Sequence, residues 1–165
     1  MLKSSVFTRK SYSVFQDNFY YNCAGNRNYR NTLMAIQELH ILSADKLNEI
    51  HFNTDGVFVI KGRGFLPGNN ETLGRINVWI DEYLKEPKEN TLVIFAFEYL
   101  NSFTTVSIIN ILKKLTTLIT RNKKLKIQWY HEEADHDIIE RGEHISSVIN
   151  FPFEYIMTKN IRRSN

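Results

Sequence analysis

The sequence predicts an α/β fold in which a mixed β-sheet, with a β-rich N-terminal part, is covered by about three helices. From residue 38 onward, strand-like apolar runs alternate with segments whose apolar residues recur every three or four positions. The run Leu92–Phe97 is apolar on both faces, which is typical of a central parallel strand. The extended segments before residue 62 have no helical segment between them, so we expect a mixed sheet rather than a purely parallel one.

The β-rich part of the domain consists of three predicted strands. Glu38–Leu42 and Asn48–Phe52 have the length and composition of short extended segments. The turn signal Asp55-Gly56 precedes Val57–Gly62, a β-branched and aromatic run that ends in glycine. Residues 65–70 contain Pro, Gly and two Asn and predict a loop.

One amphipathic helix is predicted before the central strand in the sequence and another after it. The first ends at Pro87, and the second runs from Ser102 to Thr120 with Lys113, Lys114 and Arg121 near its C-terminal end. The first helix buries Leu73, Ile76, Trp79, Ile80, Tyr83 and Leu84. The second helix buries Ile108, Ile109, Leu112, Leu115 and Ile119.

The C-terminal part adds two strands and a third helix. Leu125–Tyr130 and Phe151–Met157 are the predicted strands. Between them, Asp135–Ile149 has helical periodicity that Gly142 interrupts. The alternation of strands and helices predicts helices packed on the sheet.

Composition indicates one globular domain without a membrane segment. The 165 residues suffice to bury a core without disulfides or metals. The single cysteine, Cys23, excludes an intramolecular disulfide and suits a reducing compartment. No apolar run approaches the ~20 residues that span a bilayer, and the N-terminus lacks a secretory apolar core. We therefore expect a cytoplasmic protein.

The charge is unevenly distributed along the chain. Five of the 21 basic and one of the 18 acidic residues lie in residues 1–37, so residues 38–165 hold 16 basic and 17 acidic residues. We expect residues 1–37 to be a disordered or weakly docked extension, 38–160 the folded domain and 161–165 a short tail. The near-neutral domain gives no electrostatic reason for binding nucleic acid. A nucleic-acid module built on the basic, aromatic extension remains an alternative.

A cluster of hydroxyl side chains comes directly after the central strand. The segment Glu98-Tyr99-Leu100-Asn101-Ser102-Phe103-Thr104-Thr105 covers the predicted start of the second helix. Asn101 or Ser102 could cap this helix through its side-chain oxygen. A phosphate on Ser102 would instead meet first-turn N–H groups and the positive end of the helix dipole. Capping alone and phosphorylation both remain open at this level.

A second polar stretch, His131-Glu132-Glu133-Ala134-Asp135-His136-Asp137, contains metal-binding residue types. Its histidines are five residues apart, whereas the helical metalloprotease pattern places them four apart with a Glu between. Carboxylates at the start of a helix are also stabilising without any metal. We expect a solvated acidic loop and no metal, with a small metal-dependent enzyme as the alternative.

Several of these segments together resemble the SiaC family of bacterial regulatory phosphoproteins. The matching features are Tyr99–Thr104 with the helix after it, then Trp129-Tyr130, Gly142-Glu143 and Phe151–Phe153, all within residues 38–160. The resemblance implies a STAS-like fold, related to anti-sigma-factor antagonists, that is not an enzyme and needs no cofactor.

The resemblance also implies partner switching in cyclic-di-GMP signalling. A dedicated Ser/Thr kinase phosphorylates the family's motif, a PP2C-type phosphatase removes the phosphate, and the unphosphorylated form binds an effector, typically a diguanylate cyclase. By position, the phosphoacceptor falls on Ser102, with Thr104 and Thr105 as alternatives. The implied partner contacts are Tyr99, Asn101, Phe103 and Thr105.

The sequence departs from the family pattern in two places. Phe103 stands where the family usually has a small hydroxyl residue, which affects partner specificity. The segment from Gly62 to Asn69 is one residue longer than the corresponding family loop and lacks its Ser and Glu.

Overall fold

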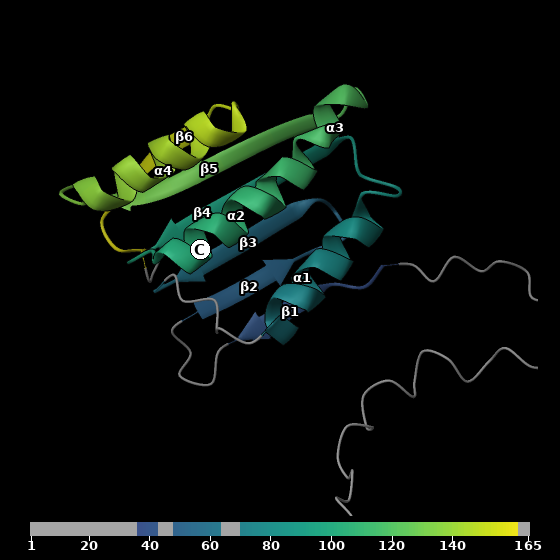
Figure 1. Cartoon of the computed structure of the whole chain (residues 1–165), viewed down its shortest axis with the longest axis horizontal. Helices are drawn as coiled ribbons and strands as arrows, with labels where there is room; N and C mark the ends of the chain where they lie inside the picture. The colour runs from purple at the N-terminus through teal and green to yellow at the C-terminus, as the bar shows by residue number, and fades with distance from the viewer. Residues whose placement is uncertain (1–35, 43–47, 64–69, 162–165) are drawn as a thin grey trace, which may run out of the picture. The chain divides into compact units, whose positions relative to one another are not determined.

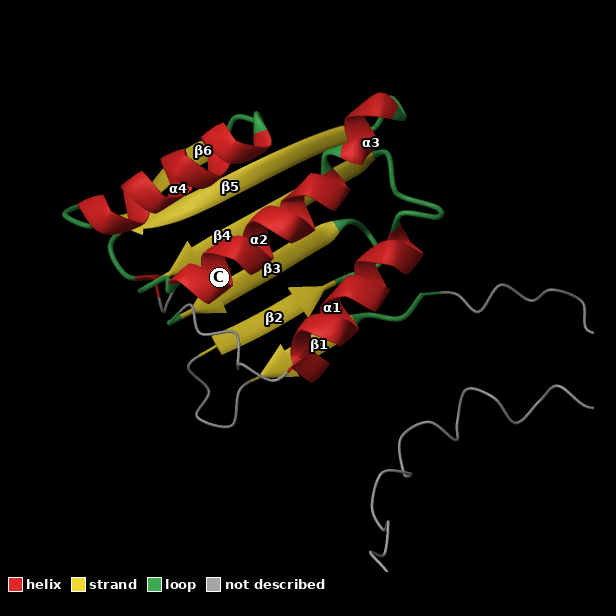
Figure 2. Ribbon diagram, in the orientation of Figure 1, coloured by secondary structure: helices red, strands yellow, loops and turns green. Residues whose placement is uncertain are grey.

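Six strands form one mixed sheet in the order β1-β2-β3-β4-β5-β6 (Figures 1 and 2). The computed structural model describes residues 36–42, 48–63 and 70–161, which belong to the unit Ala35–Asn165. Pairing is antiparallel from β1 to β3 and parallel from β3 to β6. The strands are β1 (Leu39–Leu42), β2 (Asn48–Phe52), β3 (Val57–Gly62), β4 (Asn90–Phe97), β5 (Lys124–Glu132) and β6 (Glu154–Thr158).

The turn between β2 and β3 depends on two residues. The Oδ1 atom of Asn53 accepts hydrogen bonds from the backbone N–H groups of Asp55 (3.1 Å) and Val57 (2.8 Å). Gly56 has φ 93°, and a Cβ atom there would lie 2.6 Å from the carbonyl oxygen of Asn90. Glycine is therefore required where this turn passes the start of β4.

The helices lie on one face of the sheet (Figure 1). They are α1 (Asn70–Tyr83), α2 (Ser102–Leu115), α3 (Thr117–Thr120) and α4 (His136–Ile149). Each parallel connection moves one strand in the same direction, and right-handed crossovers of that kind place their helices on the same side. The core between the layers contains Phe58, Phe95 and Trp129 from the sheet, with Ile80 from α1 and Leu112 from α2.

The α/β fold with a mixed sheet and helices covering it is confirmed, and all six predicted strands are present. One helix prediction is wrong, because Ser102–Thr120 forms two helices that meet at Thr116. The hydroxyls of Thr116 and Thr117 donate to carbonyls three residues earlier, which competes with the α-helical pattern. As a result Ile119, predicted to be buried, is exposed.

The predicted interruption at Gly142 is also wrong, because α4 is continuous through it. Gly142 is buried against Trp129, and a Cβ atom would lie 2.8 Å from the indole Nε1. The glycine thus allows close packing of α4 on β5.

The predicted extension 1–37 and tail 161–165 lie outside the described residues, apart from residues 36, 37 and 161. Of these, Ile161 is buried and its N–H donates to Glu132. Within the described ranges, no helix is both long and apolar enough to span a membrane.

Candidate functional site

The junction between β4 and α2 is organised by Asn101. Its backbone is extended (φ −89°, ψ 166°), and its Oδ1 atom accepts a hydrogen bond from the N–H of Thr104 at 2.7 Å. Asn101 is therefore the N-cap of α2, and Ser102 is the first helical residue. Of the two residues that the sequence offered as caps, the first fills the role, so the Ser102 hydroxyl is not needed for it.

The hydroxyl groups of the cluster differ sharply in exposure. Thr104 is 0% exposed and Thr105 6%, whereas Ser102 is exposed. The Thr105 hydroxyl also donates to the carbonyl oxygen of Asn101 at 3.0 Å. Thr105, expected among the partner contacts, therefore lies beneath the surface and supports the junction from inside.

The start of α2 differs electrostatically from that of α1 and α4. The first turn of α2, all of whose residues are described, contains no acidic side chain, whereas α1 has Glu71 and α4 has Asp137. The first hydrogen bond within α2 runs from the N–H of Thr105 to the carbonyl oxygen of Asn101. The N–H groups of Ser102 and Phe103 lie before it, so they have no acceptor within the helix. The positive end of this dipole can therefore accept a negative group on Ser102.

Large apolar side chains are exposed around Ser102. Tyr99 is 62% exposed, Phe103 47% and Val106 56%, while Leu100 between them is buried and anchors the loop. Val106 was not singled out from the sequence, although it is an apolar residue outside the buried stripe of its helix. Exposed apolar groups next to one another are typical of a surface that contacts a protein.

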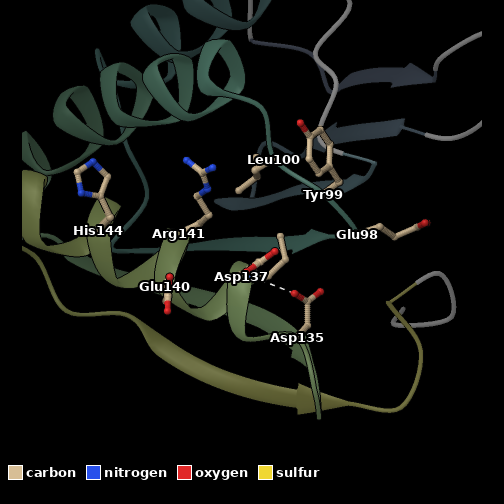
Figure 3. Close-up of a pocket in the computed structure, with 9 residues that line it drawn as sticks. Glu98, Tyr99, Leu100, Asp135, Asp137, Glu140, Arg141 and His144 are labelled. Atoms are coloured by element: carbon tan, nitrogen blue, oxygen red, sulfur yellow. Dashed lines mark hydrogen bonds between the residues drawn. The ribbon is translucent and has the colours of Figure 1, made fainter.

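A groove of about 390 Å³ separates this junction from α4 (Figure 3). One wall comes from the junction and the other from α4 and its N-cap. The lining residues are Glu98, Tyr99, Leu100, Asp135, Asp137, Ile138, Glu140, Arg141 and His144. The sequence indicated Asp135 and Asp137 only as candidate metal ligands and missed the rest of this wall, because its residues form the ordinary polar face of an amphipathic helix.

The stretch from His131 to Asp137 forms the end of β5 and the start of α4. His131 and Glu132 belong to β5, and Asp135 is the N-cap of α4, accepting from the N–H of Ile138 at 3.1 Å. His136 is the first residue of α4. In the part of the chain that the structure describes, no group of three or more His, Cys, Asp or Glu residues is placed to hold a metal ion.

The second departure from the family pattern concerns the segment after β3. Gly62 ends β3, and the Nε atom of Arg63 lies 4.0 Å from the Glu98 carboxylate. The rest of that segment, residues 64–69, lies outside the described residues.

One protein family and several solved structures are similar to this chain. The model of the SiaC family regulatory phosphoproteins matches residues 41–158. No curated protein matches the chain. A chain in the crystal structure of the diguanylate cyclase SiaD in complex with its activator SiaC from Pseudomonas aeruginosa is 19% identical, with a TM-score of 0.65, and the match covers 73% of this chain and 99% of that one. Apo-SiaC from the same organism is 16% identical with a TM-score of 0.62, covering 74% and 98% of the two chains.

Proposed function

Because the chain belongs to the SiaC family of regulatory phosphoproteins, we propose that it is a non-enzymatic switch controlled by phosphorylation of Ser102. In the unphosphorylated form it binds an effector protein through the surface around Tyr99, Asn101 and Phe103. A Ser/Thr kinase adds the phosphate and a PP2C-type phosphatase removes it. The observation that carries this proposal is the exposed Ser102 hydroxyl at the start of a helix without a first-turn carboxylate.

Exposure supports Ser102 over the two threonines after it. A kinase must bring the acceptor oxygen to its own active site, and the nearly inaccessible Thr104 and Thr105 side chains would require unwinding of the helix start. Unwinding would also break the hydrogen bonds that Asn101 makes to both residues. Ser102 can be modified with the cap intact.

The electrostatic consequence of phosphorylation is large at this position. A phosphoserine carries about −1.5 to −2 charges, and the helix dipole and first-turn N–H groups favour that charge. The fold therefore tolerates the modification. An apolar partner surface does not, because it would have to desolvate the phosphate without pairing it.

The effector is proposed to be a diguanylate cyclase. One structural relative is named as the activator of the diguanylate cyclase SiaD. In this chain, Tyr99, Phe103 and Val106 supply the aromatic and aliphatic contacts that dominate such interfaces. Phe103 in place of a small hydroxyl residue makes this surface more apolar, so we expect a correspondingly apolar site on the effector.

Phosphorylation is tested by incubating the full chain with its cognate kinase and ATP, and then analysing it by tandem mass spectrometry. We expect a single phosphate on Ser102, and none on the Ser102→Ala variant. Phosphate on Thr116 or Thr117 instead would contradict the assignment.

Switching is tested by calorimetric titration of the cognate diguanylate cyclase. Ser102→Asp should weaken binding at least about tenfold, because like-charge or unpaired charge at an interface costs several kcal/mol. Ser102→Ala should bind as the native chain does, and Ser147→Asp, at an exposed serine on α4, serves as the charge-matched control. Equal binding by Ser102→Asp and Ser147→Asp would refute the switch.

A further inference from the structure

We propose that the sheet face opposite the helices is a contact surface between two copies of this chain. In this arrangement, Leu42 of each copy enters a hollow above Ala96 of the other. The surface is distinct from the Ser102 junction, so the proposal does not depend on the proposed function.

The connectivity leaves this face without a described helix. The connections from β3 to β6 all advance in the same direction, so α1, α2 and α4 share one side (Figure 1). Side chains alternate along each strand, and those buried under the helices include Ile60, Phe95 and Trp129. Their neighbours in sequence point to the opposite face, where Val59 and Ile94 are half-buried.

A hollow of about 210 Å³ lies on this opposite face. Ala96 is paired with Lys61 on β3 and Tyr130 on β5, so a small side chain stands between two long ones. The hollow is lined by Glu49, His51, Val59, Lys61, Ile94, Ala96 and Tyr130. Pockets for small-molecule ligands usually have about 300–1,000 Å³, so this volume fits a single side chain better than a free ligand.

The chain itself carries a side chain suited to this hollow. Leu42 is 47% exposed and lies in the same row across the sheet, because Leu42 pairs with Glu49, Glu49 with Lys61 and Lys61 with Ala96. Leu42 and Ala96 are three strand spacings apart, or about 14 Å. A two-fold axis parallel to the strands, passing between β2 and β3, places each Leu42 over the other copy's Ala96. Both contacts form at once, as an isologous interface requires.

The same axis brings opposite charges together. It places Glu49 on β2 of one copy opposite Lys61 on β3 of the other, because both residues belong to the row that the axis bisects. Within one copy their side chains are 3.2 Å apart, so the four charges of a dimer form an alternating cluster. Face-to-face sheets pack about 10 Å apart, a distance that these long side chains can bridge. Charge complementarity and the fit of Leu42 therefore favour a second copy over an unrelated partner.

The first experiment measures the mass of the full chain by sedimentation equilibrium over a concentration series. We expect a monomer–dimer equilibrium that Leu42→Asp weakens by about tenfold or more, because the substitution removes the apolar side chain that fills the hollow and puts in its place a carboxylate that must be desolvated. Val78→Asp, at an exposed valine on α1, is the matched control and should leave the equilibrium unchanged. A monomer at every concentration, or a dimer indifferent to Leu42→Asp, overturns the proposal.

The second experiment separates contacts within a copy from contacts between copies. Glu49→Lys and Lys61→Glu each place like charges opposite one another in a dimer, so each variant alone should be monomeric. In a mixed dimer, one copy has lysine at positions 49 and 61 and the other has glutamate at both, so opposite charges face each other across the axis. The ion pair between positions 49 and 61 within each copy remains broken. We expect mixed dimers when the two variants are combined. Their absence, with both variants folded by circular dichroism, overturns the proposed arrangement.

Discussion

Strands β4 and β5 end in similar ways, but the helices after them begin with different charges. Each strand leads through a polar segment to a capped helix: Asn101 accepts from the N–H of Thr104, and Asp135 accepts from the N–H of Ile138. The α4 start already contains fixed negative charge, whereas the first turn of α2, fully within the described residues, contains none. Negative charge is thus already present at the start of α4, whereas at the start of α2 it would have to be added, as phosphorylation of Ser102 is proposed to do.

The largest expected effect concerns the close packing of α4 on β5. Gly142→Ala places a Cβ atom 2.8 Å from the Nε1 atom of Trp129, whose indole also donates to the carbonyl of Ile138. We expect the free energy of unfolding to fall by about 2 kcal/mol, because overpacking displaces a fully buried ring. Urea unfolding monitored by tryptophan fluorescence measures the change.

Gly74→Ala in α1 is the control for that substitution. Nothing lies within 4 Å of a Cβ atom at Gly74, so replacing a helical glycine should raise the free energy of unfolding by about 0.5–1 kcal/mol. If Gly142→Ala were as stabilising as Gly74→Ala, close packing of α4 on β5 would not be the reason for the glycine.

Gly142 also illustrates what sequence reasoning could and could not predict. Composition, turn signals and apolar runs located the six strands of the described residues, because burial on one or both faces of a strand leaves a pattern in the chain itself. They did not reveal that Gly142 faces Trp129, since that contact depends on how a helix and a strand are placed in three dimensions. The split at Thr116 was missed for a similar reason, because hydroxyl–carbonyl bonds compete with a helix whose apolar pattern continues.

The candidate site was predicted in part. Its position after β4 was evident from a polar segment between an apolar strand and a helix, and the family resemblance placed Ser102 ahead of Thr104 and Thr105, but the exposure of the three hydroxyls could not be predicted. Their exposure depends on the helical phase relative to the sheet, which Asn101 sets by acting as the cap. The sequence drew attention to Asp135 and Asp137 only as candidate metal ligands, and the rest of the α4 wall has the ordinary pattern of an amphipathic helix, so its place across the groove could not be predicted.

The next effect in size compares the two caps. Asn101→Ala should lower the free energy of unfolding by about 1 kcal/mol, since it removes the hydrogen bond to the Thr104 N–H. Asp135→Ala should cost about 0.3–1 kcal/mol more, because it also removes a charge that the α4 dipole stabilises. Chemical denaturation of both variants at low salt measures the difference. If Asn101→Ala lowered the free energy of unfolding more than Asp135→Ala, the charge at the start of α4 would not add to the effect of its cap.

A smaller effect should appear when charge is added to one helix start and removed from the other. Ser102→Asp should raise the free energy of unfolding by about 0.5 kcal/mol, and Asp137→Asn should lower it by a similar amount. Both changes should shrink at high salt, because these exposed charges are screened. Thermal unfolding at two salt concentrations checks this. Destabilisation by Ser102→Asp would mean that any loss of effector binding reflects damage to the fold.

The smallest effect concerns pH and the fixed charges of the β5–β6 edge. Hydrogen bonds from Lys126 (2.8 Å) and then from Gln128 (2.7 Å) lower the pKa of the Glu154 carboxyl from its ordinary value of 4.5. A folded-state pKa below the unfolded value means that the carboxylate stabilises the fold above about pH 4.5, and that this contribution is lost as pH falls through the folded value. Glu154→Gln should therefore flatten the decline of the unfolding midpoint as the pH falls below about 4.5. The pKa of Glu89 is lowered in the same direction by its hydrogen bond from Lys123, so Glu89→Gln should flatten the same decline independently. If the pH dependence of the unfolding midpoint were unchanged in both variants, protonation of these exposed carboxylates would not be coupled to folding. The charge contrast described above would then concern only the starts of α2 and α4.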